Sequence, residues 1–303
     1  MNEDEMEKYL TAGEIARRVK KESRNWVKEG ESILNLCERI ENRIEELGGA
    51  LAFPCNICVN DIAAHFTPSP GFTGRIPPEG LVKIDFGIHI DGYIVDTAFT
   101  IPLSSRDREM VEVAEHSLSK VSGILKAGVN ISQVGEIVEK FVKSKGFKVI
   151  RNLTGHQIDR FNLHTGLSIP NVKIFNTGKF KRDMVVAVEP FVTLIDGSGE
   201  VEEIEETYIY RFKHLSMNYT GEFSELIRSI HNSFKTLPFC ERWILSKFGR
   251  VERETLRKAI EKFRKNMVFY PVLIEKNRKK VAQAEDTFLI LEDSAINLTS
   301  ERD

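Results

Sequence analysis

The chain of 303 residues is long enough to bury a sizeable core, as one large domain or as two ordinary ones. Its 41% hydrophobic and 29% charged residues are typical of a soluble globular protein, and a net charge of −2 excludes a surface built as a whole for nucleic acid. The N-terminus is acidic and no long apolar run is present, so we expect no signal peptide, no membrane span and a cytoplasmic protein.

Two helices are predicted in the first fifty residues. Thr11 and Glu14 stand at the positions of a capping box, in which two side chains satisfy free amides of the first turn, so a helix should begin there. Apolar side chains spaced three and four apart predict a second helix over residues 33–47, which Gly48 should end. A loop rich in Pro and Gly follows at residues 68–80.

A β-hairpin over residues 82–101 is the clearest predicted element. Asp91 and Gly92 separate two alternating runs and tolerate the positive φ of a type I′ turn. That turn places Asp96 opposite Gly87, which would leave an empty place, and makes Asp85 the diagonal neighbour of Asp96. Two carboxylates so close repel each other unless a cation joins them, which predicts half of a metal site. The alternative is an ordinary solvent-exposed face.

The pattern of two helices followed by strands then repeats. Helices are predicted from Ser104 and from about Ser132 to Gly146. Strands are predicted over residues 149–153, 184–193 and 207–212. Two such halves around a shared sheet predict an α+β fold.

Helical periodicity returns over residues 217–268 before strand character resumes at 281–291, which predicts a helical insertion. Residues 200–206 carry five Glu, whereas residues 242–280 carry thirteen Lys or Arg against four Glu. Such a charge run is usually a solvated face. The sharper hypothesis is a basic patch that docks on RNA, in which case binding must depend on salt.

Four cysteines are too few for a disulfide framework. Cys55 and Cys58 have CxxC spacing, but no second CxxC completes a zinc site. We therefore expect ordinary reduced thiols at these two positions and at Cys37 and Cys240.

Three further residues extend the metal hypothesis. Glu189 and Glu285 lie in apolar runs, and an ionised Glu is rarely buried without a partner. His156 follows a Gly near a strand end, although a lone His is more often structural. With the two hairpin carboxylates these residues form a hard, oxygen-rich set that suits two divalent ions such as Mn, Fe(II) or Co, with Zn as a further candidate. Two ions that share carboxylates and a water are the arrangement of metal-assisted hydrolysis.

The order and context of these five residues, Asp85, Asp96, His156, Glu189 and Glu285, resemble the metal ligands of methionine aminopeptidases. The resemblance runs from about residue 8 to residue 292. The segments around His65, Asp85, His156, His164 and Cys240 are similar to those of the type II subfamily, and the lack of a long N-terminal extension makes the chain similar to its archaeal form.

The resemblance implies the pita-bread fold of creatinase and aminopeptidases, with pseudo-twofold halves around a curved antiparallel sheet and a winged-helix-like helical insertion. It implies a single catalytic domain over residues 1–303, with the insertion subdomain at 213–272 inside it. It also implies that two divalent ions (Co, Mn, Fe(II) or Zn) activate a bridging water, which removes the initiator methionine from nascent polypeptides when the second residue is small. Ribosome contact through the basic insertion and a monomeric state are further expectations.

The resemblance also assigns roles to the five ligands. Asp85 and Asp96 would bind one ion, His156 and Glu189 would bind the other, and Asp96 and Glu285 would bridge the two. Glu189 would in addition carry the proton during catalysis.

Substrate contacts are implied for His65 and His164, on the amine side and at the scissile carbonyl, and Phe53 would wall the methionine pocket. One departure is visible, because Ala284 and Asp286 flank the last ligand where relatives often carry Phe and His. We expect this change to alter the pocket edge or to bring an extra carboxylate near the metals.

Two rival functions remain. An Xaa-Pro peptidase of the same fold usually carries a separate N-terminal domain, and the 84 residues before Asp85 leave little room for one. A non-catalytic relative that binds ribosomes or RNA typically loses metal ligands, whereas all five are present here.

Overall fold

The computed structural model describes residues 1–175, 178–249 and 251–301. Its helices are α1 (Glu3–Arg24), α2 (Ile33–Glu46), α3 (Arg108–Ser122), α4 (Ser132–Ser144), α5 (Ser224–Phe234), α6 (Glu241–Lys247) and α7 (Arg253–Lys262). Its strands are β1 (Ala50–Val59), β2 (Ile62–Ala64), β3 (Leu81–Ile90), β4 (Tyr93–Pro102), β5 (Lys148–Val149), β6 (Thr154–Ile158), β7 (Ser168–Pro170), β8 (Val185–Val188), β9 (Phe191–Thr193), β10 (Val201–Phe212), β11 (Phe239–Cys240), β12 (Met267–Glu275), β13 (Val281–Gln283), β14 (Asp286–Ile290) and β15 (Ala295–Asn297). Among the described helices, none has the length and apolar character needed to cross a bilayer.

The first helix begins earlier than predicted. The side chain of Asn2 accepts from the amide of Glu5, and the side chain of Glu5 accepts from the amide of Asn2, so the capping box lies there. Acidic side chains in the first turn also suit the positive end of the helix dipole. The prediction of a start at Thr11 is therefore wrong, since Thr11 lies exposed in the middle of α1. The second predicted helix is confirmed as α2.

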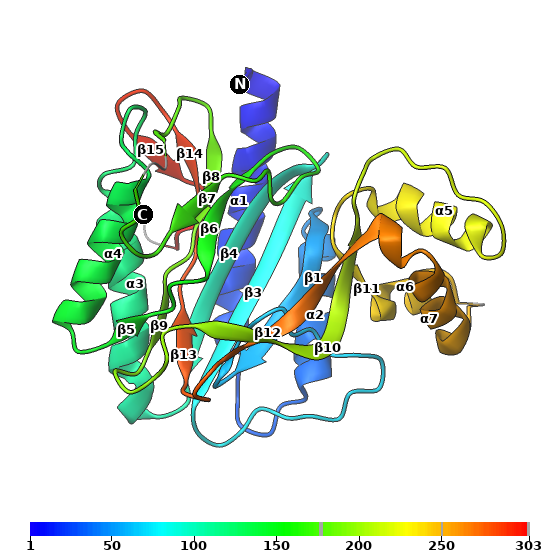
Figure 1. Cartoon of the computed structure of the whole chain (residues 1–303), viewed down its shortest axis with the longest axis horizontal. Coiled ribbons are helices and arrows are strands. Elements are labelled where there is room, and N and C mark those ends of the chain that lie inside the picture. The colour runs from blue at the N-terminus through cyan, green and yellow to red at the C-terminus, as the bar shows by residue number, and fades with distance from the viewer. Residues whose placement is uncertain (176–177, 250, 302–303) are drawn as a thin grey trace.

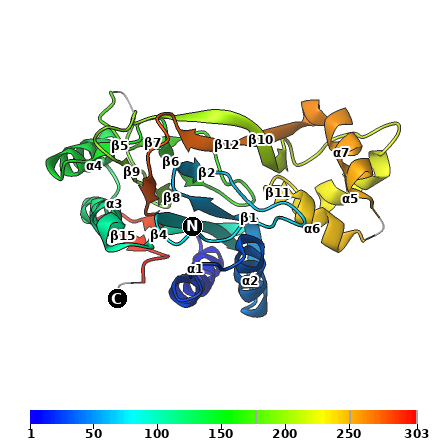
Figure 2. The ribbon, with the colours of Figure 1, turned by 90° about the horizontal axis from the view of Figure 1, so that it is seen from below.

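The first half of the molecule consists of α1 and α2 packed on the β1–β3–β4 sheet (Figure 2). The β3–β4 hairpin has the predicted register, because Gly87 pairs with Asp96 and Asp85 pairs with Ala98. Asp91 and Gly92 both have a positive φ, 51° and 89°, as the type I′ turn requires. The hairpin prediction is confirmed in register as well as in position.

The second half consists of α3 and α4 packed on the β13–β9–β5 sheet and on the sheet that contains β14, β8 and β6. The two halves join where Ala98 of β4 and Glu285 exchange backbone hydrogen bonds, at N–O distances of 3.2 and 2.9 Å. Repeated helix pairs on a shared sheet confirm the α+β prediction.

Three predicted strands are shorter or broken. The 184–193 run is divided into β8 and β9, which belong to different sheets, and Glu189 lies at the break. The 281–291 run is divided into β13 and β14 in the same way, with Glu285 at the break. The 149–153 run contributes to β5 only through Val149. Apolar composition predicted that these segments form strands. It does not predict where each run is interrupted, which is at Glu189 and at Glu285.

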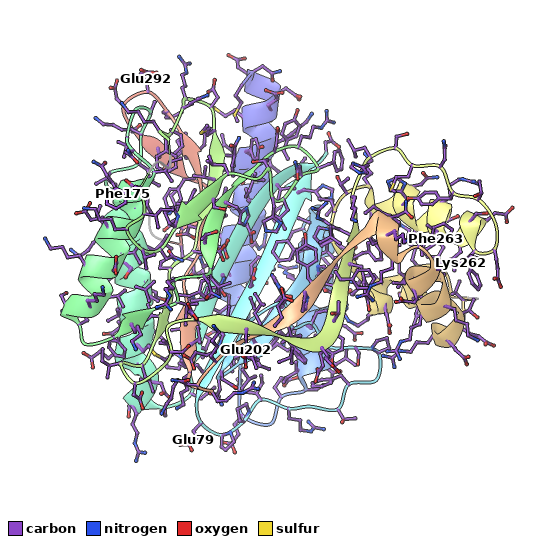
Figure 3. All side chains as sticks on the ribbon, viewed as in Figure 1. Glu79, Phe175, Glu202, Lys262, Phe263 and Glu292 are labelled. Carbon is purple, nitrogen blue, oxygen red and sulfur yellow. The ribbon has the colours of Figure 1, made fainter. Side chains whose placement is uncertain are left out.

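The β10–β12 ribbon crosses the front of the molecule and carries α5, α6 and α7 at its far end (Figure 1). These three helices share a core of their own with the outer part of the ribbon. Figure 3 shows Lys262 and Phe263 in this unit and Glu202 on β10. The helical insertion is therefore present, while its bounds at 213–272 and the single catalytic domain over residues 1–303 stay predictions.

The insertion contacts the rest of the molecule through its loop between α5 and β11. The hydroxyl of Thr236 donates to the carbonyl of Phe161, and Lys235 Nζ lies 3.6 Å from the centre of the Phe161 ring. The amide of Phe161 in turn donates to the carbonyl of Gly92 at the hairpin tip, at 2.8 Å. A buried ion pair between Arg242 and Glu41 joins α6 to α2.

Candidate metal centre

A cavity of about 260 Å³ is lined by residues of both halves and of the β10–β12 ribbon. Its walls combine carboxylate and histidine side chains with apolar and aromatic ones. All eight residues predicted from the sequence line it: Phe53, His65, Asp85, Asp96, His156, His164, Glu189 and Glu285.

Three of the predicted ligands form a compact group. Asp96, His156 and Glu285 are buried, and each offers one ligand atom within 4.8 Å of the others. Asp96 Oδ2 lies 3.5 Å from His156 Nε2. Asp85 and Glu189 stand on the same cavity wall, outside this group of three. The arrangement gathers four carboxylates and one imidazole from β3, β4, β6 and the two strand breaks.

The ligand atoms lack partners in a way that fits a metal. Asp85 Oδ1, Asp96 Oδ1 and Glu285 Oε1 are buried and have no hydrogen-bond partner among the described residues. Buried polar atoms are normally paired, and a carboxylate left without a partner is costly. Divalent cations would supply the missing partners, so the residues fit the predicted metal ions.

Burial and mutual repulsion dominate the electrostatics of the site. Loss of contact with water raises the pKa of the Asp85, Glu189 and Glu285 carboxyls well above their usual range, and the nearby charge of Asp96 raises each pKa further. Burial also raises the pKa of Asp96 itself, against the opposing effect of His156. Such a cluster is unfavourable without cations, and perturbed carboxyl groups in a cleft are typical of functional sites.

Two amide side chains that the sequence analysis missed hold these carboxylates. Gln283 Nε2 donates to Glu285 Oε2 at 3.1 Å and to Glu189 Oε2 at 3.5 Å. Asn56 Nδ2 donates to Asp85 Oδ2 at 3.3 Å. Gln283 had a local signal, because it stands two residues before Glu285 in a strand-like run and shares its face. Asn56 had none, since its contact depends on the pairing of β1 with β3.

His65 is positioned as a neutral hydrogen-bond acceptor. Its Nδ1 lies 3.1 Å from the carbonyl oxygen of Pro271, and burial lowers the pKa of His65 to about 4. A carbonyl only accepts, so Nδ1 carries the single proton of the neutral ring and Nε2 is left with a free lone pair. This tautomer suits contact with an N–H donor of a substrate. The positive φ of 66° at His65 shows that the backbone is held in an uncommon conformation to aim the ring.

His164 lies beside the ligand group. Its ring centre is 4.3 Å from that of His156 and 6.1 Å from that of Tyr270. Burial, with added repulsion from His156 and His65, lowers the pKa of His164 well below its ordinary value, so the ring is neutral at pH 7.

The apolar wall comes from segments far apart in the chain. Of the residues on this wall, only Phe53 was predicted from the sequence. The structure adds seven apolar residues, namely Ala64, Leu153, Leu163, Phe191, Ile209, Pro238 and Tyr270. Pro238 belongs to the insertion, and Ile209 and Tyr270 pair across the β10–β12 ribbon. No local pattern predicts such a wall, because its members meet only through the tertiary fold.

The place beside Gly87 is not empty, which corrects the expectation for the hairpin. Phe53 of β1 pairs with Gly87, and a Cβ on Gly87 would lie 2.3 Å from Phe53 Cε1. The missing side chain therefore makes room for the aromatic ring that walls the cavity, rather than for a metal ion.

Substituting Gly87 with Ala is expected to displace the Phe53 ring. Overpacking of this kind costs about 1–3 kcal/mol of stability, and KM for a methionyl peptide should rise while bound metal is retained. Thermal unfolding, steady-state kinetics and metal analysis check this result. Gly123→Ala is the matched control, because a Cβ there meets only one backbone oxygen at 3.7 Å. An unchanged KM in Gly87→Ala would contradict the assigned place of Phe53.

Neither Ala284 nor Asp286 lines the cavity, so the expectation of an extra carboxylate near the metals or a changed pocket edge is wrong. Asp286 Oδ1 lies 2.9 Å from Lys20 Nζ of α1, and Asp286 lines a separate hollow on the opposite side of the sheet. Adjacent strand residues point to opposite faces, which explains why Asp286 turns away from the side that Glu285 occupies. The cysteines are buried free thiols, as expected.

Comparison with known proteins agrees with this geometry. Residues 7–211 match metallopeptidase family M24. The chain is 40% identical over 299 residues to the methionine aminopeptidase of Saccharolobus solfataricus, covering 98% of each chain. It is 39% identical over 288 residues to that of Methanocaldococcus jannaschii, covering 95% of this chain and 96% of the relative.

Solved structures show the same fold at low identity. A methionine aminopeptidase from Thermotoga maritima superposes with a TM-score of 0.72 at 20% identity, over 99% of this chain and 98% of that one. A thermophilic Arx1 reaches 0.82 at 19% identity, over 99% and 91%. A prolidase from Pyrococcus furiosus reaches 0.63 at 17% identity, over 100% of this chain and 66% of that one. The pita-bread fold expected from the sequence is confirmed.

Proposed function

The chain belongs to metallopeptidase family M24, and from that premise we propose that Asp85, Asp96, His156, Glu189 and Glu285 hold two divalent metal ions. Its activity is that of a metal-dependent methionyl aminopeptidase, in line with relatives of that name at 35–40% identity over nearly the whole chain. The observation that carries the metal proposal is the set of buried ligand atoms without a partner in the described part of the chain.

We assign Asp85 and Asp96 to one ion and His156 and Glu189 to the other, with Asp96 and Glu285 shared. Co, Mn, Fe(II) and Zn all suit this donor set. Two such ions, when bound, lower the pKa of a water and polarise the scissile carbonyl.

The remaining steps belong to side chains of this chain. Glu189 would accept the proton of the attacking water and return it to the leaving amine, because its carboxylate lines the cavity beside the other ligands. His65 Nε2 would accept a hydrogen bond on the amine side of the substrate, and His164 would orient the scissile carbonyl. Phe53 and the ribbon residues would enclose the methionine side chain and exclude water.

Metal-stripped protein is expected to be inactive on the peptide Met-Ala-Ser and to regain methionine release on titration with Mn, Fe(II), Co or Zn. The added metals restore the polarisation that the side chains alone lack. Released methionine and bound metal per chain are the measurements, and saturation near two equivalents supports the proposed pair. Preferential cleavage of Xaa-Pro peptides would contradict the methionyl specificity. Full activity after complete metal removal would contradict the metal centre.

We further propose that the substrate is the N-terminal methionine of nascent polypeptides in the cytoplasm, and that the insertion contacts the ribosome. Residues 213–272 carry twelve Lys or Arg against six Glu. Six of those cations form ion pairs with Glu, so the excess available to RNA is smaller than the sequence suggests. A monomeric state also stays a prediction.

Co-sedimentation with ribosomes is expected to weaken as salt increases, and charge reversal at the exposed Lys247 and Lys265, which are not among those six paired cations, should weaken it further. The reason is that each lysine near a phosphate releases a bound counterion. Reversal of Lys145, which lies exposed in the catalytic body after α4, serves as the control. Binding that ignores salt would contradict the proposed contact.

A further inference from the structure

A buried ion pair lies directly behind the candidate metal centre. Lys20 Nζ and Asp286 Oδ1 are 2.9 Å apart, and their side chains are only 6% and 9% exposed. Such pairs are costly to desolvate, and replacing one by apolar residues is often neutral or stabilising. Stability alone is therefore a poor explanation for a lysine and an aspartate at this position.

The pair is connected to the backbone of a predicted ligand. Lys20 Nζ donates to the hydroxyl of Thr97 at 2.8 Å and to the carbonyl of Glu285 at 3.4 Å. The Thr97 hydroxyl itself donates to the carbonyl of Glu285 at 2.9 Å. With the amide of Ala98, three donors converge on that single carbonyl oxygen. Hydrogen bonds from Lys20 and Thr97, on the side of the sheet away from the cavity, thus fix the backbone at Glu285.

Asp286 is fixed from the C-terminal side as well. Its Oδ1 accepts from the hydroxyl of Thr299 at 2.9 Å, and its Oδ2 accepts from the Asn297 amide at 3.0 Å. Both oxygens of the buried Asp286 carboxylate are therefore hydrogen-bonded. A fully satisfied buried network is rigid, whereas a partly satisfied one is not.

In β4 and in the segment that leads into β14, successive side chains point to opposite sides of the sheet. Asp96 and Glu285 line the cavity, while their chain neighbours Thr97 and Asp286 contact Lys20 on the other side of the sheet. Thr287 adds a second link, because its hydroxyl accepts from the amide of Asp96 and donates to its carbonyl, both at 2.7 Å. Holding the backbone on one side therefore sets the direction of both carboxylates on the other side.

We propose that Lys20 and Asp286 are positioning residues that hold Asp96 and Glu285, the two carboxylates shared between the metal ions, in the geometry that binds metal; this inference rests on the proposed function. Neither residue touches substrate or metal. Metal sites require their ligands within about 0.5 Å of the productive geometry, and loss of the groups that orient ligands typically costs 10–100-fold in metal affinity.

The test compares metal-stripped Asp286→Asn, Lys20→Met and Lys20→Arg with the parent chain. Calorimetric titration with Mn(II) gives the affinity, and the visible spectrum of the Co(II)-loaded protein reports the ligand geometry. Asp286→Asn and Lys20→Met should bind Mn(II) 10–100-fold more weakly and show an altered Co(II) spectrum, whereas Lys20→Arg should stay near the parent. At saturating metal, KM for Met-Ala-Ser should not change, since the cavity lining is untouched.

Glu241→Gln is the matched control. Glu241 is also a buried carboxylate, 8% exposed in its side chain, but it pairs with Arg253 and Arg257 inside the insertion. It should lose stability without losing metal affinity. Because Lys20→Met leaves a buried carboxylate unpaired and can prevent folding, the double variant Lys20→Met/Asp286→Asn, which removes both charges, is measured as well.

The outcomes separate the two proposals. A parent chain that binds no metal refutes the metal centre itself. A parent that binds metal, with Asp286→Asn and the double variant binding equally tightly, refutes only the positioning role. An equal loss of affinity in Glu241→Gln refutes it too, because the effect would then follow general destabilisation.

Discussion

Glu285→Gln is expected to lower kcat for a methionyl peptide by about 10³-fold or more and to reduce the metal content of the purified protein. The Lewis-acid contribution of bound metal amounts to several kcal/mol, and each 1.36 kcal/mol corresponds to a factor of ten in rate. An amide has no charge to share between two ions, yet it has the size of the carboxylate, so packing is preserved. Steady-state kinetics and elemental analysis measure the two effects.

Glu292→Gln is the matched control, since Glu292 is exposed in the same C-terminal stretch and Figure 3 shows it at the edge of the molecule, away from the catalytic strands. The metal-free proteins give a second, independent readout. Removing one of four crowded carboxylates relieves repulsion, so metal-free Glu285→Gln should unfold no earlier than the metal-free parent. Retained turnover with two bound metals would exclude Glu285 as a ligand.

His164→Ala is expected to lower kcat by about 10²–10³-fold, the usual cost of removing one group that stabilises developing charge on a carbonyl oxygen. Metal content should not change, because His164 lies beside the ligand group without belonging to it. The measurements are single-turnover kinetics at saturating metal and the metal content of the same sample. His116→Ala on the exposed face of α3 controls for loss of an imidazole. Metal loss in His164→Ala would move this histidine into the ligand set.

The sequence predicted those features that depend on local pattern. The β3–β4 hairpin was predicted in register because alternation and the turn at Asp91 and Gly92 act over a few residues. Each of the eight site residues stands in a short sequence motif that can be recognised without the tertiary structure. The structure brings all eight to one cavity. Their roles in binding metal and substrate stay predictions.

Features that depend on contacts between distant residues could not be predicted from the sequence. Pro238 and Tyr270 join the cavity only because the ribbon folds over the sheet. Asp286 and Lys20 lie near opposite ends of the sequence, so no local pattern around either residue predicts their contact. At Thr11 the local pattern itself was misleading. The residues there match a capping box, but the helix begins earlier, where Asn2 and Glu5 form the cap.

The contacts of Lys235 and Thr236 with Phe161 matter for any attempt to engineer a smaller enzyme. The same loop that carries Thr236 also carries Pro238 into the cavity wall, and Phe161 stands three residues before His164. Excising α5–α7 would thus take away one side of the cavity and release the segment that carries His164. A minimal version of this peptidase must keep residues 235–238, or replace them with another bridge of the same shape.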